Sequence, residues 1–209
     1  MDYRNADGSI AEMCGNGIRV MARYLVEKGH QPEGIFAIDT RDGIKHLRVP
    51  MTGDISVNMG KVSDEMEEVS VLQNSRTWDA LNISVGNPHA VTFVADLNEV
   101  GSLDDAPVVT PASSYPEGVN VEFVQILPNQ EARMRVHERG CGETRSCGTG
   151  TCAVALAATI HTGGKLPSRW TIYPPGGRLI VDLDGHSNAT LIGPAELVRD
   201  VEIGQYLTA

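Results

Sequence analysis

The chain has 209 residues, of which 41% are hydrophobic, and a formal net charge of −10 at pH 7. This size suits one large or two small globular domains, and the negative charge argues against nucleic acid or an anionic membrane as the partner. No apolar run approaches the roughly 20 residues that span a bilayer, and four cysteines are too few for a secreted disulfide framework, so we expect a cytoplasmic protein.

The first predicted helix begins directly after a cysteine-glycine turn. The C-G-x-G turn at residues 14–17 opens the helical pattern IRVMARYLVEKG, which stops at Gly29. Two strand-like stretches follow, at residues 35–40 and 44–49. The glycine of the turn at residues 41–43 supplies the positive φ of a tight hairpin. The first part of the chain therefore predicts a helix followed by a β-hairpin.

The second half of the chain repeats these elements. Three strand-like stretches come first, at residues 80–94, 119–127 and 131–139. The C-G-x-G turn at residues 147–150 then opens the pattern TCAVALAATIHTGG, whose apolar character predicts a helix buried on all sides. The strand-like stretches WTIYP and RLIVDL follow, on either side of a Pro-Gly-Gly turn. Four elements in the same order indicate an internal repeat.

The repeat predicts the fold class. Alternating strands around one apolar helix per half indicate an α/β fold of the α+β type. We expect two pseudo-symmetric domains, each a mixed β-sheet wrapped around a central helix. We place the N-terminal domain at residues 1–78 and the C-terminal domain at residues 79–197, and expect residues 198–209 to pack back on the first domain.

The two copies differ in what precedes the cysteine. Three strand-like stretches precede Cys147, whereas only thirteen residues precede Cys14. If the copies are equivalent, the first lacks on the order of 50–60 residues of N-terminal strands, and Met1 is an internal methionine of a longer protein. A pair that is asymmetric by nature is the alternative.

The residues around the two cysteines indicate an anion site and an acid–base pair. The free N–H groups and the positive end of a helix stabilise negative charge, so a thiol at this place is suited to becoming a thiolate. The glycine turns let the backbone N–H groups of residues 15–17 and 148–150 approach a carboxylate closely. If both helix starts face one anion, one thiolate removes a proton and the opposite thiol returns one to the other face. This chemistry needs no metal, flavin or pyridoxal group, and we find no motif for one.

Other uses of the cysteines fit less well. Cys141, Cys147 and Cys152 lack the paired short spacing and the histidines of a zinc site. A cysteine hydrolase with a histidine base leaves the duplicated thiol unexplained, and no lysine follows the glycine turns as it would in a P-loop. Oxidation of Cys14 with Cys147 is expected only as an inactive side state, and Cys141 and Cys152 are expected to be structural.

Four motifs resemble those of the diaminopimelate epimerase family: NADGSIAEMCGNGIR, VGNPHAV, EGVNVEF and HERGCGETRSCGTGT. The resemblance covers essentially the whole chain, and the two cysteine motifs together are highly specific. It implies a cofactor-independent isomerase that interconverts LL- and meso-diaminopimelate on the bacterial route to lysine and peptidoglycan. It also implies two pseudo-symmetric domains with the active site in the cleft between them.

The resemblance implies a role for each matching residue. Cys14 and Cys147 resemble the two acid–base thiols, and Glu138 and His89 resemble polar groups beside the reacting centre. The implied backbone cradle for the reacting carboxylate consists of Gly15, Asn16, Gly148 and Thr149. The implied clamp on the distal amino-acid end of the substrate consists of Asn5, Asn87, Asn120 and Arg139. A guanidinium can grip a carboxylate with two hydrogen bonds, while amides supply both donors and acceptors.

Two alternatives stay open. Proline and hydroxyproline racemases use the same facing thiols, although their first motif usually has histidine where this chain has Asn16, and their substrate has one amino-acid end. A truncated and inactive fragment is the second alternative, because family members normally begin with strands that carry a glycine-asparagine-aspartate-phenylalanine turn, which we do not find here. As partners we expect a small-molecule substrate, no nucleic acid and no membrane, with a homodimer as one possible assembly.

Overall fold

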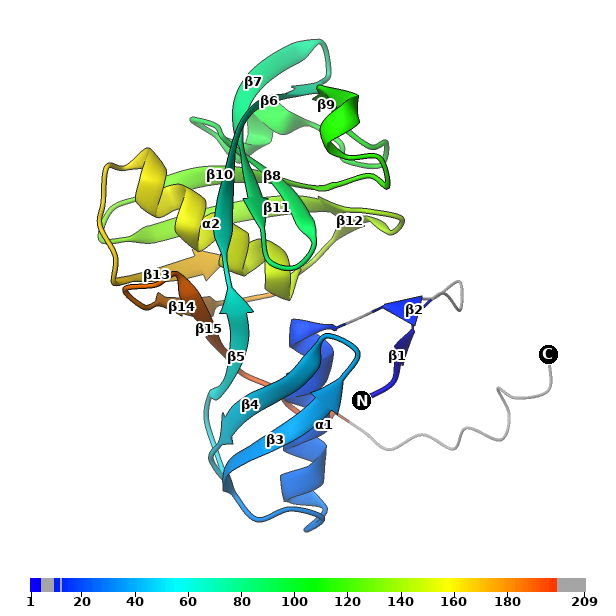
Figure 1. The fold of residues 1–209 in the computed structure, drawn as a ribbon, viewed down its shortest axis with the longest axis vertical. Helices are drawn as coiled ribbons and strands as arrows, with labels where there is room; N and C mark the ends of the chain where they lie inside the picture. The colour runs from blue at the N-terminus through cyan, green and yellow to red at the C-terminus, as the bar shows by residue number, and fades with distance from the viewer. Residues whose placement is uncertain (5–9, 12, 199–209) are drawn as a thin grey trace, which may run out of the picture.

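The computed structural model describes residues 1–4, 10–11 and 13–198 of the chain. Within these residues the fold is α+β, as predicted, with one large mixed β-sheet, a short β-ribbon and two α-helices. The lower part of the molecule in Figure 1 is built on α1 (Gly15–Glu27), and the upper part on α2 (Gly148–His161). Neither of these helices is long and apolar enough to cross a membrane.

The strands and short helices follow one another along the chain as a series of hairpins and crossovers. The ribbon consists of β1 (Tyr3–Arg4) and β2 (Ile10–Ala11). The strands of the large sheet are β3 (Gly34–Thr40), β4 (Gly43–Val49), β5 (Ile55–Lys61), β6 (Ser63–Gln73), β7 (Arg76–Ser84), β8 (Pro88–Phe93), β9 (Val108–Thr110), β10 (Asn120–Leu127), β11 (Glu131–Glu138), β12 (Gly142–Thr144), β13 (Ser168–Tyr173), β14 (Leu179–Leu183) and β15 (Asn188–Gly193). Two single turns of 3₁₀-helix are η1 (Leu97–Val100) and η2 (Ala112–Ser114).

One strand joins the two repeats into a single sheet. The described sheet has 13 strands in the order β3-β4-β5-β15-β14-β13-β11-β10-β8-β7-β6-β9, with β12 paired to β11. β15 comes from the far end of the chain, yet it pairs antiparallel with β5 of the first repeat, with Leu191 opposite Val57. The first repeat therefore completes its side of the sheet with a strand from the second.

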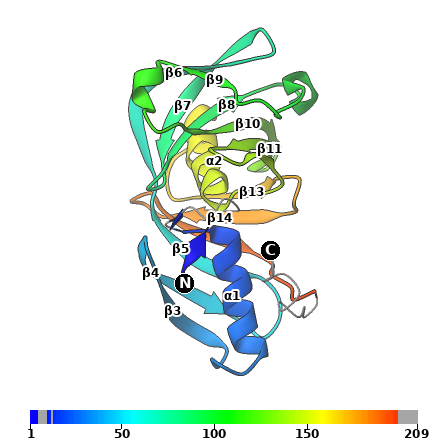
Figure 2. The same ribbon diagram turned by 90° about the vertical axis from the view of Figure 1, so that its right-hand side faces the viewer.

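The two helices are buried to different extents because their side chains differ. Most residues of α2 are buried, and strands surround this helix in the upper part of Figure 2. In contrast, α1 buries Ile18, Ala22 and Val26 but leaves Val20 and Tyr24 45% and 43% exposed. The repeat therefore holds for the order of the elements and not for their burial.

The structure confirms the two predicted helices and the hairpins that follow them, and it corrects other details. Each helix begins at the first glycine of its C-G-x-G turn, because the cysteine before it is the cap. Residues 80–94 do not form one strand, since Gly86, with a φ of 84°, turns the chain between β7 and β8. The sequence pattern does not predict β6, whose first half is acidic and mostly exposed, or β5 and β15.

The domain boundary at residue 78 stays a prediction. Residues on either side of it pair closely, because β6 and β7 form a hairpin that turns at Asn74 and Ser75. Residues 199–209, which were expected to pack back on the first domain, lie outside the described residues.

A buried arginine holds α1 to the loop after β4. Arg23 is only 3% exposed, and its guanidinium donates to the carbonyl oxygens of Pro50 at 2.6 Å, Met51 at 2.8 Å and Gly53 at 2.7 Å. Its Nε donates to the carbonyl oxygen of Ala195 at 3.3 Å, just beyond β15. One side chain thus donates to four backbone acceptors from two separate segments of the chain.

Replacing Arg23 with methionine is therefore expected to destabilise the fold. Methionine fills much of the same space but makes none of these four hydrogen bonds, each worth about 1 kcal/mol net, so the free energy of unfolding should fall by about 3 kcal/mol. Urea unfolding followed by circular dichroism measures this change. The matched control is Arg48→Met, because Arg48 is exposed on β4; equal stability of the two variants would contradict the assignment.

Candidate active site

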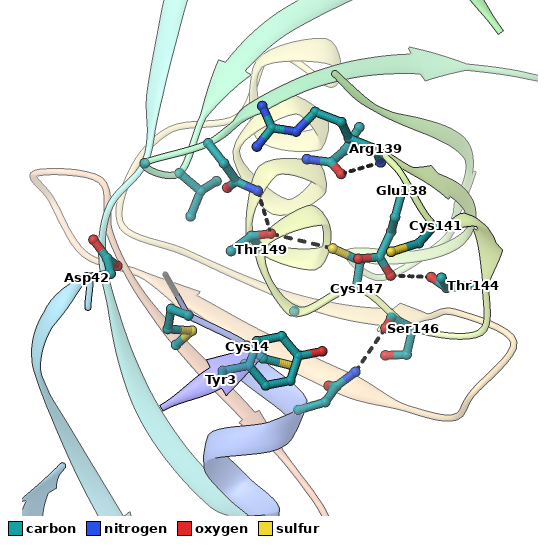
Figure 3. A pocket seen from close by; sticks show the side chains of 18 residues that line it. Tyr3, Cys14, Asp42, Glu138, Arg139, Cys141, Thr144, Ser146, Cys147 and Thr149 are labelled. Atoms are coloured by element: carbon teal, nitrogen blue, oxygen red, sulfur yellow. Dashed lines mark hydrogen bonds between the residues drawn. The ribbon is translucent and has the colours of Figure 1, made fainter. Parts of the chain in front are cut away.

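A cavity of about 390 Å³ lies between the two helix starts (Figure 3). The first repeat contributes the Cys14 turn and Tyr3 to its wall, and the second contributes the Cys147 turn, the ends of β11 and β12, and the β7–β8 turn. Both predicted thiols therefore line one space. The cavity is large enough for a small molecule and opens to solvent.

Both cysteines cap their helices in the same way. Cys14 has an extended backbone, and its Sγ accepts a hydrogen bond from the N–H of Gly17 at 3.3 Å. Cys147 repeats this geometry, with its Sγ accepting from the N–H of Gly150 at 3.4 Å. Serine, threonine, aspartate and asparagine are the usual N-caps, so a thiol in this position twice is unusual. The cap places each sulfur at the positive end of a helix.

The two helix starts touch each other through glycines. A Cβ atom added to Gly148 would lie only 2.9 Å from the Cα of Gly15, and one added to Gly15 would lie 3.2 Å from the Cα of Gly148. A hydrogen bond of 2.9 Å from Asn16 Nδ2 to the carbonyl oxygen of Ser146 joins the repeats beside this contact. Only residues without a side chain allow the backbones to come so close.

Among the described residues, four backbone N–H groups at the two helix starts have no acceptor. The N–H groups of Gly17 and Gly150 are used by the thiol caps, and those of Ile18 and Thr151 bond to the carbonyl oxygens of the cysteines. The free groups belong to the first two residues of each helix. They are the N–H groups of Gly15, Asn16, Gly148 and Thr149, which contact no acceptor among the described residues. Such groups at two helix starts can hold a carboxylate.

Cys147 is held as a thiol. Burial raises the pKa of the Cys147 thiol well above its ordinary value, and the carboxylates of Glu138 and Glu122 raise this pKa further. Hydrogen bonds from Thr149 and Gly150 lower the pKa, as expected at a helix start, but burial outweighs them. The sequence pattern alone indicates only the helix start, because burial and the two carboxylates come from the fold.

A chain of polar groups runs from the core to this sulfur. Glu122 and His89 are fully buried, and His89 Nδ1 lies 2.7 Å from Glu122 Oε1. His89 Nε2 lies 3.0 Å from Asn87 Oδ1, and Asn87 Nδ2 is 3.4 Å from the Thr149 hydroxyl, which lies 3.5 Å from Cys147 Sγ. Asn87 Nδ2 donates to the Thr149 hydroxyl, which leaves the hydroxyl hydrogen of Thr149 able to point at the sulfur, while the roles of the two His89 nitrogens depend on the tautomer.

Glu138 and Arg139 line the cavity at the end of β11, with Glu138 beside Cys147 (Figure 3). Glu138 accepts a hydrogen bond from the Thr144 hydroxyl. Asn120 accepts from the backbone N–H of Arg139 at 3.0 Å and donates to the carbonyl oxygen of Pro88, also at 3.0 Å. Both ends of the Asn120 amide are therefore used to hold the strand ends in place. Among the described residues, the Arg139 guanidinium makes one long contact, of 3.5 Å, to the carbonyl oxygen of Glu117.

The structure brings most of the expected site residues together. The expected residues that line the cavity are Cys14, Gly15, Asn16, Asn87, Asn120, Glu138, Arg139, Cys147, Gly148 and Thr149. His89 does not line it but lies behind Asn87, and Asn5 falls outside the described residues.

Sequence reasoning missed three other residues. Tyr3 lines the cavity, Glu122 lies behind it, and Cys141, which was expected to be structural, is exposed and lines it. Glu122 carried a usable signal, since it is the one charged residue within the otherwise apolar stretch VNVEFVQIL. Cys152 is fully buried, as expected of a small apolar residue in the helix. Among the described residues, no three histidine, cysteine, aspartate or glutamate side chains come together as metal ligands.

Solved structures share this fold. A hydroxyproline epimerase from Agrobacterium vitis matches with a TM-score of 0.67 and 17% sequence identity, over 90% of this chain and 66% of that one. A probable proline racemase from Agrobacterium radiobacter K84 matches with a TM-score of 0.65 and 18% identity, over 94% of this chain and 70% of that one. The fold is therefore one that racemases and epimerases use.

Sequence comparison identifies the family. The model of the diaminopimelate epimerase family matches residues 1–64 and 81–198, on either side of the β6–β7 hairpin. The diaminopimelate epimerase of Streptomyces coelicolor is 48% identical over 207 residues, which are 97% of this chain and 72% of that protein. The diaminopimelate epimerase of Thermobifida fusca is 44% identical over 204 residues, with 97% and 72% covered. The chain belongs to the diaminopimelate epimerase family and is an isomerase.

The contact between the helix starts predicts that Gly148→Ala impairs the enzyme. Alanine favours helices over glycine by about 1 kcal/mol, but here its methyl group would push the two helix starts apart. We expect kcat/KM for epimerisation to fall about 100-fold or more, because small displacements of catalytic groups are costly.

A coupled assay on LL-diaminopimelate measures this loss. Gly185→Ala is the control, since a Cβ atom at Gly185 meets no atom within 4 Å and its φ is not positive. Unchanged kcat/KM in Gly148→Ala would show that the close contact is dispensable.

Proposed function

We propose that this chain interconverts LL- and meso-diaminopimelate by moving protons between Cys14 and Cys147 on opposite faces of the substrate, without a cofactor. The observation that supports this most directly is the pair of thiol caps on two helix starts that touch at Gly15 and Gly148 and share one cavity. An α-carbon held by its carboxylate between these helix starts would lie between the two sulfurs.

Each proton transfer balances without an added reagent. The Cys14 thiolate takes the α-hydrogen as a proton, and the electron pair of the C–H bond stays on the α-carbon as a carbanion. The Cys147 thiol then gives its proton to the opposite face of that carbon, which leaves a Cys14 thiol and a Cys147 thiolate. The reverse reaction starts from this second state.

The free N–H groups at the helix starts would stabilise the carbanion. Negative charge spreads from the α-carbon into the carboxylate, and the donors of Gly15, Asn16, Gly148 and Thr149 would face its oxygens. Donors that are already in place cost no reorganisation when charge develops, which is the largest single contribution in many enzymes.

The environment of Cys147 supports a starting state in which Cys14 is the thiolate and Cys147 is the thiol. Its pKa, raised by burial, Glu138 and Glu122, keeps the proton on this sulfur until the carbanion takes it. When Cys147 becomes a thiolate, the Thr149 hydroxyl, which accepts from Asn87, would donate to its negative charge, and His89 would hold Asn87 in place. We therefore assign His89 an indirect role, through Asn87, and Glu138 a direct one as a cavity residue.

Arg139 and the asparagines would hold the other end of the substrate. Diaminopimelate has two zwitterionic ends, and the Arg139 guanidinium is available to pair with the distal carboxylate. Asn87 would face the substrate directly, and Asn5 is proposed for the same clamp. Asn120 would act by fixing the backbone of Arg139. We also propose that the protein is cytoplasmic and that it forms a homodimer.

Deuterium exchange tests the proposed function. LL-diaminopimelate is incubated with the reduced 209-residue chain in D₂O, and proton NMR follows the α-hydrogen and the appearance of the meso isomer. We expect exchange together with inversion for this substrate and neither for L-proline or trans-4-hydroxy-L-proline. Exchange of a proline substrate alone would favour a racemase, and exchange of none would favour an inactive fragment.

Removing either thiol should abolish inversion. In Cys14→Ala and Cys147→Ala one face of the substrate has no proton donor, so the same NMR experiment should detect no meso isomer from LL-diaminopimelate. Any residual exchange should retain the LL configuration, because the remaining thiol acts on one face only. Cys152→Ala, a change at a buried thiol outside the cavity, is the control and should invert normally. Wild-type inversion by either of the first two variants would end the two-base proposal.

Neutralising Glu138 should make Cys147 easier to deprotonate. Glu138→Gln removes one of the two carboxylates that raise the pKa of the Cys147 thiol, so this pKa should fall. Alkylation by iodoacetamide at a series of pH values, with mass spectrometry of the Cys147 peptide, measures the midpoint.

We expect the midpoint for Cys147 to move to lower pH in Glu138→Gln. The exposed Glu117→Gln serves as the control and should leave it unchanged. A midpoint that stays constant in Glu138→Gln would contradict the electrostatic role of this carboxylate.

A further inference from the structure

Arg19 is a buried arginine of α1 that the site described above does not use. The residue is only 5% exposed, and its guanidinium turns back along the helix to the first two helical residues. Nη1 donates to the carbonyl oxygen of Gly15 at 3.0 Å, and Nη2 donates to the side-chain oxygen of Asn16, also at 3.0 Å. The guanidinium therefore lies directly behind the start of α1.

The Asn16 side chain links the two repeats, and its partners fix its orientation. A guanidinium has only donors, and a carbonyl oxygen can only accept. The amide oxygen must therefore face Arg19, and the amide nitrogen must face the carbonyl oxygen of Ser146, at 2.9 Å (Figure 3). Ser146 directly precedes Cys147. A chain of hydrogen bonds thus runs from behind one helix start to the residue before the cysteine of the other.

The position of the Arg19 charge is unfavourable for the helix itself. A positive charge near a helix N-terminus opposes the helix dipole, and a buried guanidinium usually has a carboxylate partner. Among the described residues Arg19 forms no salt bridge, and its Nε has no hydrogen-bond partner. The stability of the helix does not explain an arginine here, whereas an anion held at the helix starts would offset its charge.

Arg23, one turn further along α1, shows what an arginine does for the fold alone. It is equally buried, but its guanidinium donates to carbonyl oxygens of the loop after β4 and of the segment beyond β15. None of these acceptors belongs to a residue that lines the cavity. Arg19 instead contacts Gly15 and Asn16, which both line it. One arginine therefore serves the packing of α1, and the other contacts the site.

We propose that Arg19 is a positioning residue that fixes the Asn16 side chain as a brace between the repeats and so holds the start of α1 opposite the start of α2. This inference rests on the two-base function proposed above, in which two thiols have to reach one α-carbon. Arg19 acts through Asn16 and moves no proton.

The first experiment observes the Asn16 side chain directly and needs no turnover. In protein labelled with nitrogen-15, NMR measures how fast the side-chain amide hydrogens of Asn16 exchange with water, and the signals that Asn16→Ala lacks assign them. In Arg19→Met we expect this exchange to become about tenfold faster, the effect of one lost hydrogen bond to a charged group. The Asn120 amide, which donates to the carbonyl oxygen of Pro88 at 3.0 Å, is the internal control and should exchange as in the wild type.

The second experiment tests whether Arg19 acts through Asn16. Inversion of LL-diaminopimelate in D₂O gives kcat/KM for the wild type, Arg19→Met, Asn16→Ala and the double variant. Asn16→Ala keeps the backbone N–H group at the helix start and removes only the brace. We expect kcat/KM to fall about tenfold or more in each single variant and no further in the double variant. Losses that multiply in the double variant would show that Arg19 acts independently of Asn16 and would overturn the inference.

Arg23→Met is the matched control, because it removes a buried arginine from the same helix. This variant is expected to be less stable, so it is measured where circular dichroism shows it to be folded. Its kcat/KM should then stay within about twofold of the wild type, and the exchange of the Asn16 amide should not change. An equal loss of kcat/KM in Arg23→Met would assign the effect of Arg19→Met to a loosened helix and would contradict the inference.

Arg19→Lys tests the geometry of the side chain while keeping its charge. An ammonium group lacks the planar fork that serves Gly15 and Asn16 together, so both readouts should change in the same direction as in Arg19→Met, by about threefold. Wild-type values of both readouts in the two Arg19 variants would overturn the inference and leave the proposed function intact. Absence of inversion in the wild type would remove the proposed function, while amide exchange would still show whether Arg19 fixes Asn16.

Discussion

The contact between Gly15 and Gly148 is the constraint on which the site depends. Two helix starts bring two positive dipole ends together, and like charges at this distance repel unless negative charge lies between them. The thiol caps and a carboxylate ligand would supply that charge, in a chain whose overall charge is already −10. Leu191 of β15 packs on both glycines, with Cδ2 at 3.0 Å and 3.3 Å from their ideal Cβ positions. The strand that joins the repeats into one sheet therefore also supports the contact between their helix starts.

The two cysteines share one local motif but lie in different surroundings. Cys14 and Cys147 share a turn sequence, an extended cap and a hydrogen bond from the third residue of the helix. Their surroundings differ, because Cys147 is buried against two carboxylates, whereas Cys14 is partly exposed beside Tyr3. Two-base inversion needs one thiolate and one thiol, because two thiols offer no base to remove the proton and two thiolates offer no acid to return one. The asymmetry of the two halves, visible also in the unequal burial of the helices, thus bears directly on the proposed chemistry.

Much of the fold was predictable because its signals are local. Helix starts, hairpin turns and apolar strands follow from neighbouring residues, and the repeat confirms each of them in a second copy. β5, β6 and β15 were missed because none of them has a continuous apolar pattern of its own, and β15 pairs with β5 from the other end of the chain. The site was predictable where residues lie in the two cysteine motifs. Glu122, Tyr3 and the exposed position of Cys141 were not, since their distance from the cysteines in space depends on the packing of distant strands.

The sequence by itself determined the family, the α+β class and the presence of two thiols at helix starts, because each of these depends on residues that are close together along the chain. The tertiary structure alone decided that the two thiols face one cavity, that His89 lies behind Asn87, and that burial and two carboxylates raise the pKa of Cys147. Burial and the charge of neighbours act through space, and a pKa is set by their sum. A motif of a few residues fixes the helix start and its N–H donors, but not the burial of the thiol or the charges of distant neighbours.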